Sequence, residues 1–351
     1  MVLTVYFFVT NLKRYSYVWL FLFLFTLILS VKYLYYQSTG DLSLFMLIIS
    51  HVGFGIYLIE KKNGYIISKY IYTIIVFYLA YFSLVGTSPH DIAEKSSGNI
   101  VNYIVLSFSI LIIGLYYRNY NKVIVFPAIF SLLISFWTLG RSGIIVSIIL
   151  ILGVLIIKYM RNLNKFTFSL MLLATSFFGY SVYKFMLKLS QSIIYKFGER
   201  SSFIEESPRS EIIKAYFSEL NTRKVLFGLD YYEFYFAGFN NLHNSFLDFH
   251  SKFGLGGMLV IGIVFIILIF FLLTKQFLYF ILLTCLLLRG ATDTVMLVGD
   301  YDYILLFLIL VCVEDLMKKN HRIMPVEKFE YYKGKWVKNS NNGIGWLNAK
   351  K

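Results

Sequence analysis

Residues 254–273 read GLGGMLVIGIVFIILIFFLL, and none of these 20 positions carries a charge. A helix of about 20 residues is long enough to cross the roughly 30 Å hydrocarbon core of a bilayer. Soluble domains rarely contain an apolar run of this length. The stretch therefore predicts a transmembrane helix, and similar runs recur along the chain.

The composition of the whole chain indicates the same class of protein. Of its 351 residues, 58% are hydrophobic and 15% are charged, whereas soluble domains average about 45 to 50% apolar and about 25% charged residues. This balance excludes an ordinary soluble domain and favours a polytopic membrane protein. The two cysteines, Cys285 and Cys312, lie inside apolar runs without partner spacing, so neither a disulfide framework nor a zinc site is expected.

Ten segments are apolar enough to be expected as membrane spans. They cover residues 17–36, 42–59, 66–85, 100–117, 123–139, 142–157, 166–185, 254–273, 277–288 and 303–316. The segment at 277–288 is short for a span. We therefore expect an all-α polytopic membrane protein with about ten transmembrane helices. Its expected parts are about seven spans in 1–185, an external loop in 186–253, about three spans in 254–316 and a basic cytoplasmic tail in 317–351.

Basic residues set the expected orientation. Lys and Arg occupy every second connection between spans, and nine more follow Leu316; these regions hold 19 basic and five acidic residues, which accounts for the formal net charge of +14. Cytoplasmic loops are enriched in Lys and Arg, so both termini are expected in the cytoplasm. The excess charge could instead indicate a nucleic-acid partner, but no basic patch remains outside the inner connections, so none is expected.

The loop at 186–253 is the only long stretch expected outside the membrane, and long loops in compact folds are usually functional. Its centre predicts a helix, because Ser207 is a suitable N-cap and Pro208 a suitable first residue. A stripe of apolar residues at helical spacing follows: Ile212, Ile213, Tyr216, Phe217 and Leu220. Arg209 lies in the first turn, where the helix dipole disfavours a cation unless an anion binds beside it. Arg209 is therefore a candidate anion ligand, with a solvated surface arginine as the alternative.

A second arginine, Arg141, lies in the tight connection TLGRSG, residues 138–143, between two apolar arms. Each arm is only about 17 residues long, so the connection is expected at the outer interface of the membrane. An arginine there runs against the positive-inside bias. A bound anion explains such a residue, and an arginine that snorkels to the interface is the alternative.

The third candidate is His243, in the stretch NNLHNSFLDFH at 240–250, where the external loop returns to the membrane. A short helix is expected to follow and to be broken by glycines, Gly254, Gly256 and Gly257. Near neutral pH an imidazole can act as a general base toward a sugar hydroxyl, whereas a lone loop histidine is often simply solvated. Three further residues are weaker candidates for substrate binding: Asn244, His250 and Tyr216.

Three motifs in a fixed order carry a resemblance to a known family. They are GRSG at 140–143, Arg209 followed by LFG at 226–228, and HNSFL at 243–247 leading into FGLGG at 253–257. In this order and spacing the chain resembles the superfamily of O-antigen ligases and Wzy-type polymerases of bacterial envelopes, over roughly residues 123–316. Two positions depart from the family pattern. Tyr216 lies where a tryptophan often follows the loop arginine, and Leu229 lies where a second glycine is common.

The resemblance implies a GT-C-like glycosyltransferase at the outer face of the bacterial cytoplasmic membrane. It would act on undecaprenyl-pyrophosphate-linked oligosaccharides without a metal ion or other cofactor. The resemblance also implies that Arg141 and Arg209 hold the pyrophosphate of the donor, and that His243 orients or deprotonates the acceptor hydroxyl. The chemistry agrees, because guanidinium groups match a pyrophosphate in charge and geometry. The expected partners are the lipid-linked donor and acceptor glycans, membrane lipid and a chain-length regulator.

Three functions are weighed against one another. The leading expectation is polymerisation of repeat units into an O-antigen, capsule or exopolysaccharide. A ligase that passes the finished glycan to another acceptor shares the same motifs. A transporter of lipid-linked oligosaccharide should instead carry ionisable residues in the middle of its spans, whereas the candidates here gather at the expected outer face.

Overall fold

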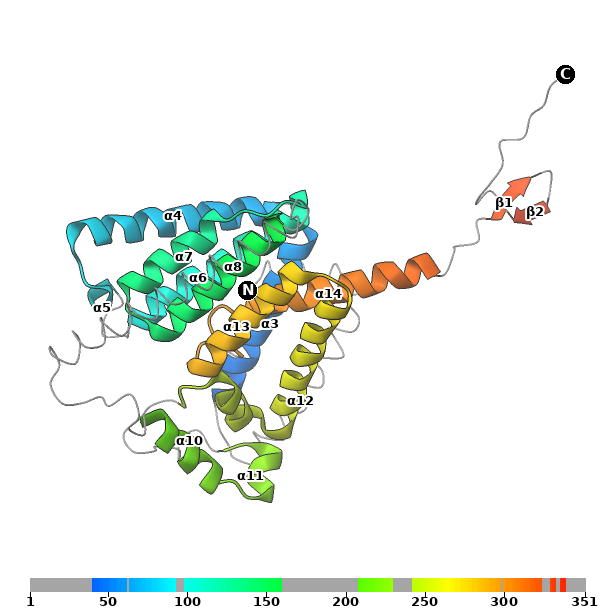
Figure 1. The fold of residues 1–351 in the computed structure, drawn as a ribbon. Coiled ribbons are helices and arrows are strands. Elements are labelled where there is room, and N and C mark those ends of the chain that lie inside the picture. The colour runs from blue at the N-terminus through cyan, green and yellow to red at the C-terminus, as the bar shows by residue number, and fades with distance from the viewer. Residues whose placement is uncertain are drawn as a thin grey trace, which may run out of the picture. The chain divides into compact units, whose positions relative to one another are not determined.

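The computed structural model describes residues 40–61, 63–92, 98–159, 208–229, 242–297, 299–323, 329–332 and 335–338. Helices account for nearly all of them (Figure 1). In chain order the elements are α3 (Gly40–Glu60), α4 (Asn63–Val85), α5 (Pro89–Ile92), α6 (Gly98–Tyr120), α7 (Phe126–Trp137), α8 (Arg141–Tyr159), α10 (Pro208–Ser218), α11 (Thr222–Phe227), α12 (Ser245–Leu273), α13 (Phe277–Thr292), α14 (Asp302–Ile323), β1 (Phe329–Tyr332) and β2 (Lys335–Lys338).

Four of these helices, α4, α6, α8 and α12, are long and apolar enough to cross a membrane. Shorter apolar helices cover Met46–Glu60, Phe126–Trp137 and Phe277–Thr292. The helical fold class is thereby confirmed, and the four long helices support a membrane protein. The expected spans at 17–36 and 166–185 lie outside the described residues, so the number of spans and the orientation stay predictions.

Helix α6 is the centre of the bundle. It packs against α4, α7, α8 and α13, and these helices lie side by side in Figure 1. Its apolar side chains between Val101 and Leu115 are mostly buried. Helix α13 packs in turn against α8 and α12. Helix α13 therefore links α12, which follows the long loop, to α6 and α8, which precede that loop.

Small residues bring α6, α7 and α8 close together. A Cβ added at Gly143 on α8 would lie 2.3 Å from Oδ1 of Asn102 on α6. Between α7 and α8, the hydroxyl of Ser147 lies 2.9 Å from the hydroxyls of both Ser131 and Ser135. Small residues and interhelical hydrogen bonds are the usual means by which helices associate in a membrane. A side chain at Gly143, the second glycine of the GRSG motif, would therefore crowd Asn102.

Helix α12 contains the break that its glycines predict. Gly254 has φ 54° and ψ −138°, which separates a first segment, starting at Ser245, from the long apolar remainder. The first segment begins with a capped turn, because the side chain of Asn244 accepts hydrogen bonds from the backbone N–H groups of Phe246 and Leu247. The predicted break is confirmed at Gly254, whereas Gly256 and Gly257 continue the helix.

The residues from 311 onward form a separate compact unit. Among its described residues are β1 and β2, which pair antiparallel with Phe329 opposite Lys338. This hairpin was not anticipated for the basic tail. Its strands alternate aromatic or β-branched residues with charged ones over part of their length, a composition that suits strands better than helices.

Candidate functional site

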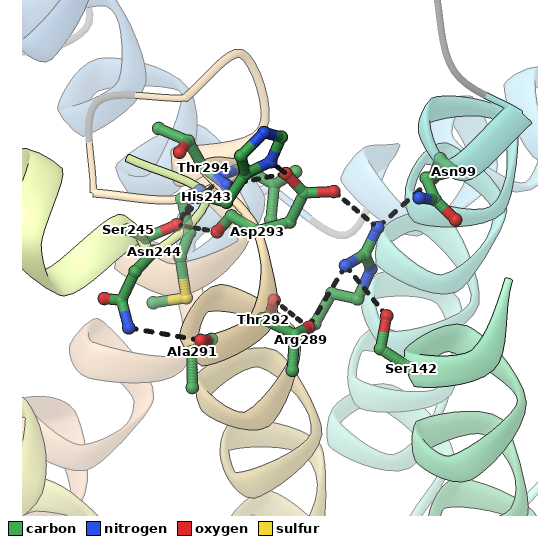
Figure 2. Close-up of polar contacts among 12 residues, drawn as sticks. Asn99, Ser142, His243, Asn244, Ser245, Arg289, Ala291, Thr292, Asp293 and Thr294 are labelled. Carbon is green, nitrogen blue, oxygen red and sulfur yellow. Dashed lines mark hydrogen bonds and ion pairs between the residues drawn. The ribbon is translucent and has the colours of Figure 1, made fainter. Parts of the chain in front are cut away.

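The side chain of Arg289, near the end of α13, is at the centre of the candidate site. It is 1% exposed. Its NH1 group donates to the hydroxyls of Ser142 (3.3 Å) and Thr292 (3.2 Å), and its NH2 group donates to the backbone carbonyl of Asn99 (3.3 Å). One guanidinium thus joins the first turns of α6 and α8 to the end of α13 (Figure 2).

Asp293, one turn after Arg289, supplies the negative charge that a buried guanidinium requires. Its Oδ2 lies 3.3 Å from NH2 of Arg289. Its Oδ1 accepts a hydrogen bond from the backbone N–H of Thr294 (2.9 Å) and lies 3.6 Å from Nδ1 of His243. The carboxylate therefore bridges the buried arginine and the histidine, as Figure 2 shows.

His243 is held in an unusual backbone conformation beside this carboxylate. Its φ is +46°, in the left-handed region that few residues other than glycine adopt. The next residue, Asn244, caps α12 and also donates from Nδ2 to the backbone carbonyl of Ala291 (3.2 Å). The side chain of His243 stays 30% exposed. Strained residues of this kind concentrate at functional sites, which keeps His243 a candidate.

Ser245 fastens the same segment to the loop that follows α13. Its buried hydroxyl donates to the backbone carbonyl of Asp293 (2.7 Å) and accepts from the N–H groups of Val295 (2.9 Å) and Met296 (3.1 Å). The loop is fixed at its other end by Asp302, whose carboxylate accepts from two further backbone N–H groups. The distance between His243 and Asp293 is thus set by backbone as well as by side chains.

Arg141 is the first residue of α8, and its side chain is exposed. The preceding turn is as tight as predicted, since α7 ends at Trp137 and Leu139 has φ 53°. Ser142, the residue after Arg141, contacts Arg289. The chain of contacts from Ser142 through Arg289 and Asp293 to His243 therefore joins two of the three sequence motifs.

Arg209 is the second residue of α10, which begins at Pro208 as the sequence predicts. The helix is anchored through Tyr216, which is 1% exposed and whose hydroxyl forms a hydrogen bond with Nδ1 of His250. The other ring nitrogen of His250 donates to the backbone carbonyl of Val225 (3.2 Å). Burial raises the pKa of the Tyr216 phenol above its ordinary value, with a smaller contribution from Asp248. Tyr216 therefore stays protonated and donates to His250.

Two glycines close the contact between α11 and α12. Gly228 has φ 85°, and the N–H of Leu229 donates to the carbonyl of Ser251 (2.9 Å). A Cβ at Gly254 would lie 2.2 Å from the carbonyl oxygen of Leu226 and 2.6 Å from the nitrogen of Gly228. The motifs LFG and FGLGG are thus two halves of one contact. Through it and His250, the helix that carries Arg209 is attached to the segment that follows His243.

The three weaker candidates, His250, Tyr216 and Asn244, all use their side chains in contacts within the protein. His250 and Tyr216 are buried and bonded to each other, which indicates a structural role. Asn244 uses its side chain for capping and for Ala291. Within the described part of the chain, no group of three or more His, Cys, Asp or Glu side chains could hold a metal ion.

Sequence reasoning did not identify Arg289 and Asp293. Their only local sign is a charged residue at the end of an apolar run with a carboxylate four positions later, a spacing that places both on one helix face. Their importance comes from contacts with Ser142 and His243, which are distant in the sequence. No protein-family model, no curated protein and no solved structure matches the chain.

Proposed function

We propose that the protein is a membrane glycosyltransferase that polymerises oligosaccharide repeat units carried on undecaprenyl pyrophosphate. The proposal is carried by two sets of contacts. Arg289 joins the first turns of α6 and α8, and Asp293 lies between Arg289 and His243, which immediately precedes the N-cap of α12. Helix N-termini favour anions, and Arg141 begins one of these helices. Arg141, which would bind the anion, and His243, the candidate base, are thus both next to residues that contact Arg289 or Asp293.

The proposed reaction needs few protein groups. The hydroxyl of the acceptor sugar gives its proton to the imidazole of His243, while the oxygen of that hydroxyl attacks C1 of the donor sugar. The bond between C1 and the pyrophosphate oxygen breaks, and undecaprenyl pyrophosphate leaves with the bonding electrons. Arg141 and Arg209 would stabilise the negative charge that develops on the pyrophosphate. His243 would then release its proton to the leaving group or to water.

A ligase remains the second candidate, because transfer to another acceptor needs the same donor chemistry. A transporter is less favoured by the positions of the candidate residues. Arg141, His243 and Arg289 lie at the starts or ends of apolar helices rather than along their middle, whereas a transport pathway needs polar groups at mid-membrane depth.

Purified protein in liposomes, supplied with an undecaprenyl-pyrophosphate-linked repeat unit, tests the proposal. We expect longer glycan chains, together with release of undecaprenyl pyrophosphate, both measured by mass spectrometry. Replacing Arg141, Arg209 or His243 singly by Ala should abolish chain growth. Arg223→Ala is the matched control, since Arg223 is exposed on α11. Normal chain length in any two of the three site variants would contradict the assignment.

A further inference from the structure

We propose that the basic tail, residues 317–351, binds the surface of a membrane that contains anionic phospholipid. The tail includes the end of α14 and the hairpin of β1 and β2. It holds nine Lys and Arg residues but only two acidic ones, a net charge of +7. The inference is independent of the proposed function, because it concerns this segment and not the candidate site.

The end of α14 carries the first of these charges. Lys318, Lys319 and Arg322 lie in its last two turns, and the helix ends at Ile323. At a rise of 1.5 Å per residue, that end lies about 10 Å beyond Leu316, the last residue of the expected span. The field of a charged surface extends about 10 Å at 0.1 M salt. The three cations are therefore within the range at which an anionic bilayer attracts them.

A short connection keeps the hairpin within reach of the same surface. Strand β1 begins at Phe329, and α14 ends at Ile323. A chain of this length spans at most about 20 Å when it is fully extended. The hairpin is therefore tethered to the end of a helix that we expect to span the membrane. A tether raises the effective concentration of the hairpin at the bilayer surface, so weak contacts suffice for binding.

The register of the hairpin collects aromatic positions on one face. Phe329 pairs with Lys338, and Tyr331 pairs with Trp336. Residues directly opposite in an antiparallel pair share a face of the sheet, as do residues two apart in one strand. Three aromatic positions and one lysine therefore share a face, whereas Glu330, the only acidic residue of the two strands, belongs to the other. Trp and Tyr favour the headgroup region of a bilayer.

An anionic lipid surface fits these features better than a nucleic acid does. Both attract Lys and Arg. Only the lipid surface is within reach of the tether by construction, and basic residues interleaved with aromatic ones are typical of segments that lie at a bilayer interface. Each Lys or Arg beside an anionic leaflet strengthens binding roughly fivefold. The expected ligand is a phospholipid with a net negative headgroup, such as phosphatidylglycerol; zwitterionic phosphatidylcholine is its neutral counterpart.

The fluorescence of Trp336 in lipid nanodiscs, which leave both membrane faces accessible, tests the proposal. Trp19, Trp137 and Trp346 are replaced by Phe, so that Trp336 is the only tryptophan of the chain. All discs contain phosphatidylcholine with brominated acyl chains, which quench tryptophan only at short range. At about 0.15 M salt we expect quenching to increase with the proportion of phosphatidylglycerol and to be weak without it.

Neutralising the hairpin should weaken this binding. Lys335→Gln together with Lys338→Gln should lower the ratio of bound to free tail roughly 25-fold, so that half of the maximal quenching requires more phosphatidylglycerol. Lys122→Gln together with Lys275→Gln is the matched control, because both lysines are exposed and lie in other connections. Its titration curve should match that of the protein with all four lysines.

Two results would overturn the inference: quenching that does not depend on phosphatidylglycerol, or a titration curve that the K335Q/K338Q pair leaves unchanged. A DNA duplex added to discs of neutral lipid tests the competing partner. If the fluorescence of Trp336 responds to the duplex and not to phosphatidylglycerol, the basic tail is a nucleic-acid-binding segment and the proposal is wrong.

Discussion

Gly254 offers the most direct test of how the external segment is held. A Cβ at this position would lie 2.2 Å from the carbonyl oxygen of Leu226 and 2.6 Å from the nitrogen of Gly228, and φ is 54°. Both contacts are with backbone, which cannot rotate away as a flexible side chain can. Overpacking costs about 1 to 3 kcal/mol, and a disfavoured backbone conformation costs about 1 to 3 kcal/mol more. Gly254→Ala should therefore weaken docking of α11 on α12 by about 3 kcal/mol.

Trypsin cleavage after Lys224, a residue of α11, measures this docking. When opening is fast relative to cleavage, the cleavage rate follows the population of the opened state. A loss of about 3 kcal/mol corresponds to a rise of roughly a hundredfold, up to the rate for a fully open segment. Cleavage at this position is quantified by mass spectrometry after brief digestion of protein in liposomes.

Gly262→Ala is the matched control for this experiment. Gly262 lies on the same helix α12, and a Cβ added there would meet nothing within 4 Å. Its cleavage rate should equal that of the native protein. Equal rates in the two variants would refute the conclusion that Gly254 permits the close contact between α11 and α12.

Three further substitutions test the network around the site. Ser245→Ala leaves two backbone N–H groups without their acceptor and should lower the free energy of unfolding by about 2 to 4 kcal/mol, seen as a lower melting temperature; Ser218→Ala, at an exposed hydroxyl, should change it by no more than about 0.5 kcal/mol. His250→Ala should speed trypsin cleavage in α11, because the bonds to Tyr216 and Val225 are lost; an unchanged rate would contradict the anchoring role. Arg289→Met leaves Asp293 without its cation and should destabilise the protein by about 3 kcal/mol or less, since Asp293 is partly exposed; a rise in melting temperature would show that the pair does not stabilise the fold.

Local features of the fold were predictable because they depend on short stretches of sequence. Pro208 at the start of α10 and the break of α12 at Gly254 follow from the backbone preferences of proline and glycine. The tight turn before Arg141 follows from the lengths of the apolar arms on either side. Each of these predictions needed only the residues within about one helical turn, or one span, of the feature.

The contacts that complete the site could not be predicted in this way. Arg289 meets Ser142, which is 147 positions away in the sequence, and Asp293 meets His243, which is 50 positions away. The hydrophobic pattern shows that Arg289 ends an apolar run. It does not show that this side chain contacts the first turns of α6 and α8. Likewise, the hydrogen bond between Tyr216 on α10 and His250 on α12 joins residues 34 positions apart, so the sequence did not show that the two side chains contact each other.

The central claim is that the protein lengthens a lipid-linked glycan, and the glycans of cells that lack the protein test it most directly. Surface glycan and undecaprenyl-pyrophosphate-linked intermediates are extracted and sized together. The polymerase account predicts that long chains disappear and that single repeat units remain, attached at the cell surface. Long polymer that accumulates on its lipid carrier would contradict it in favour of a ligase, and single units trapped on the cytoplasmic side would contradict it in favour of a transporter.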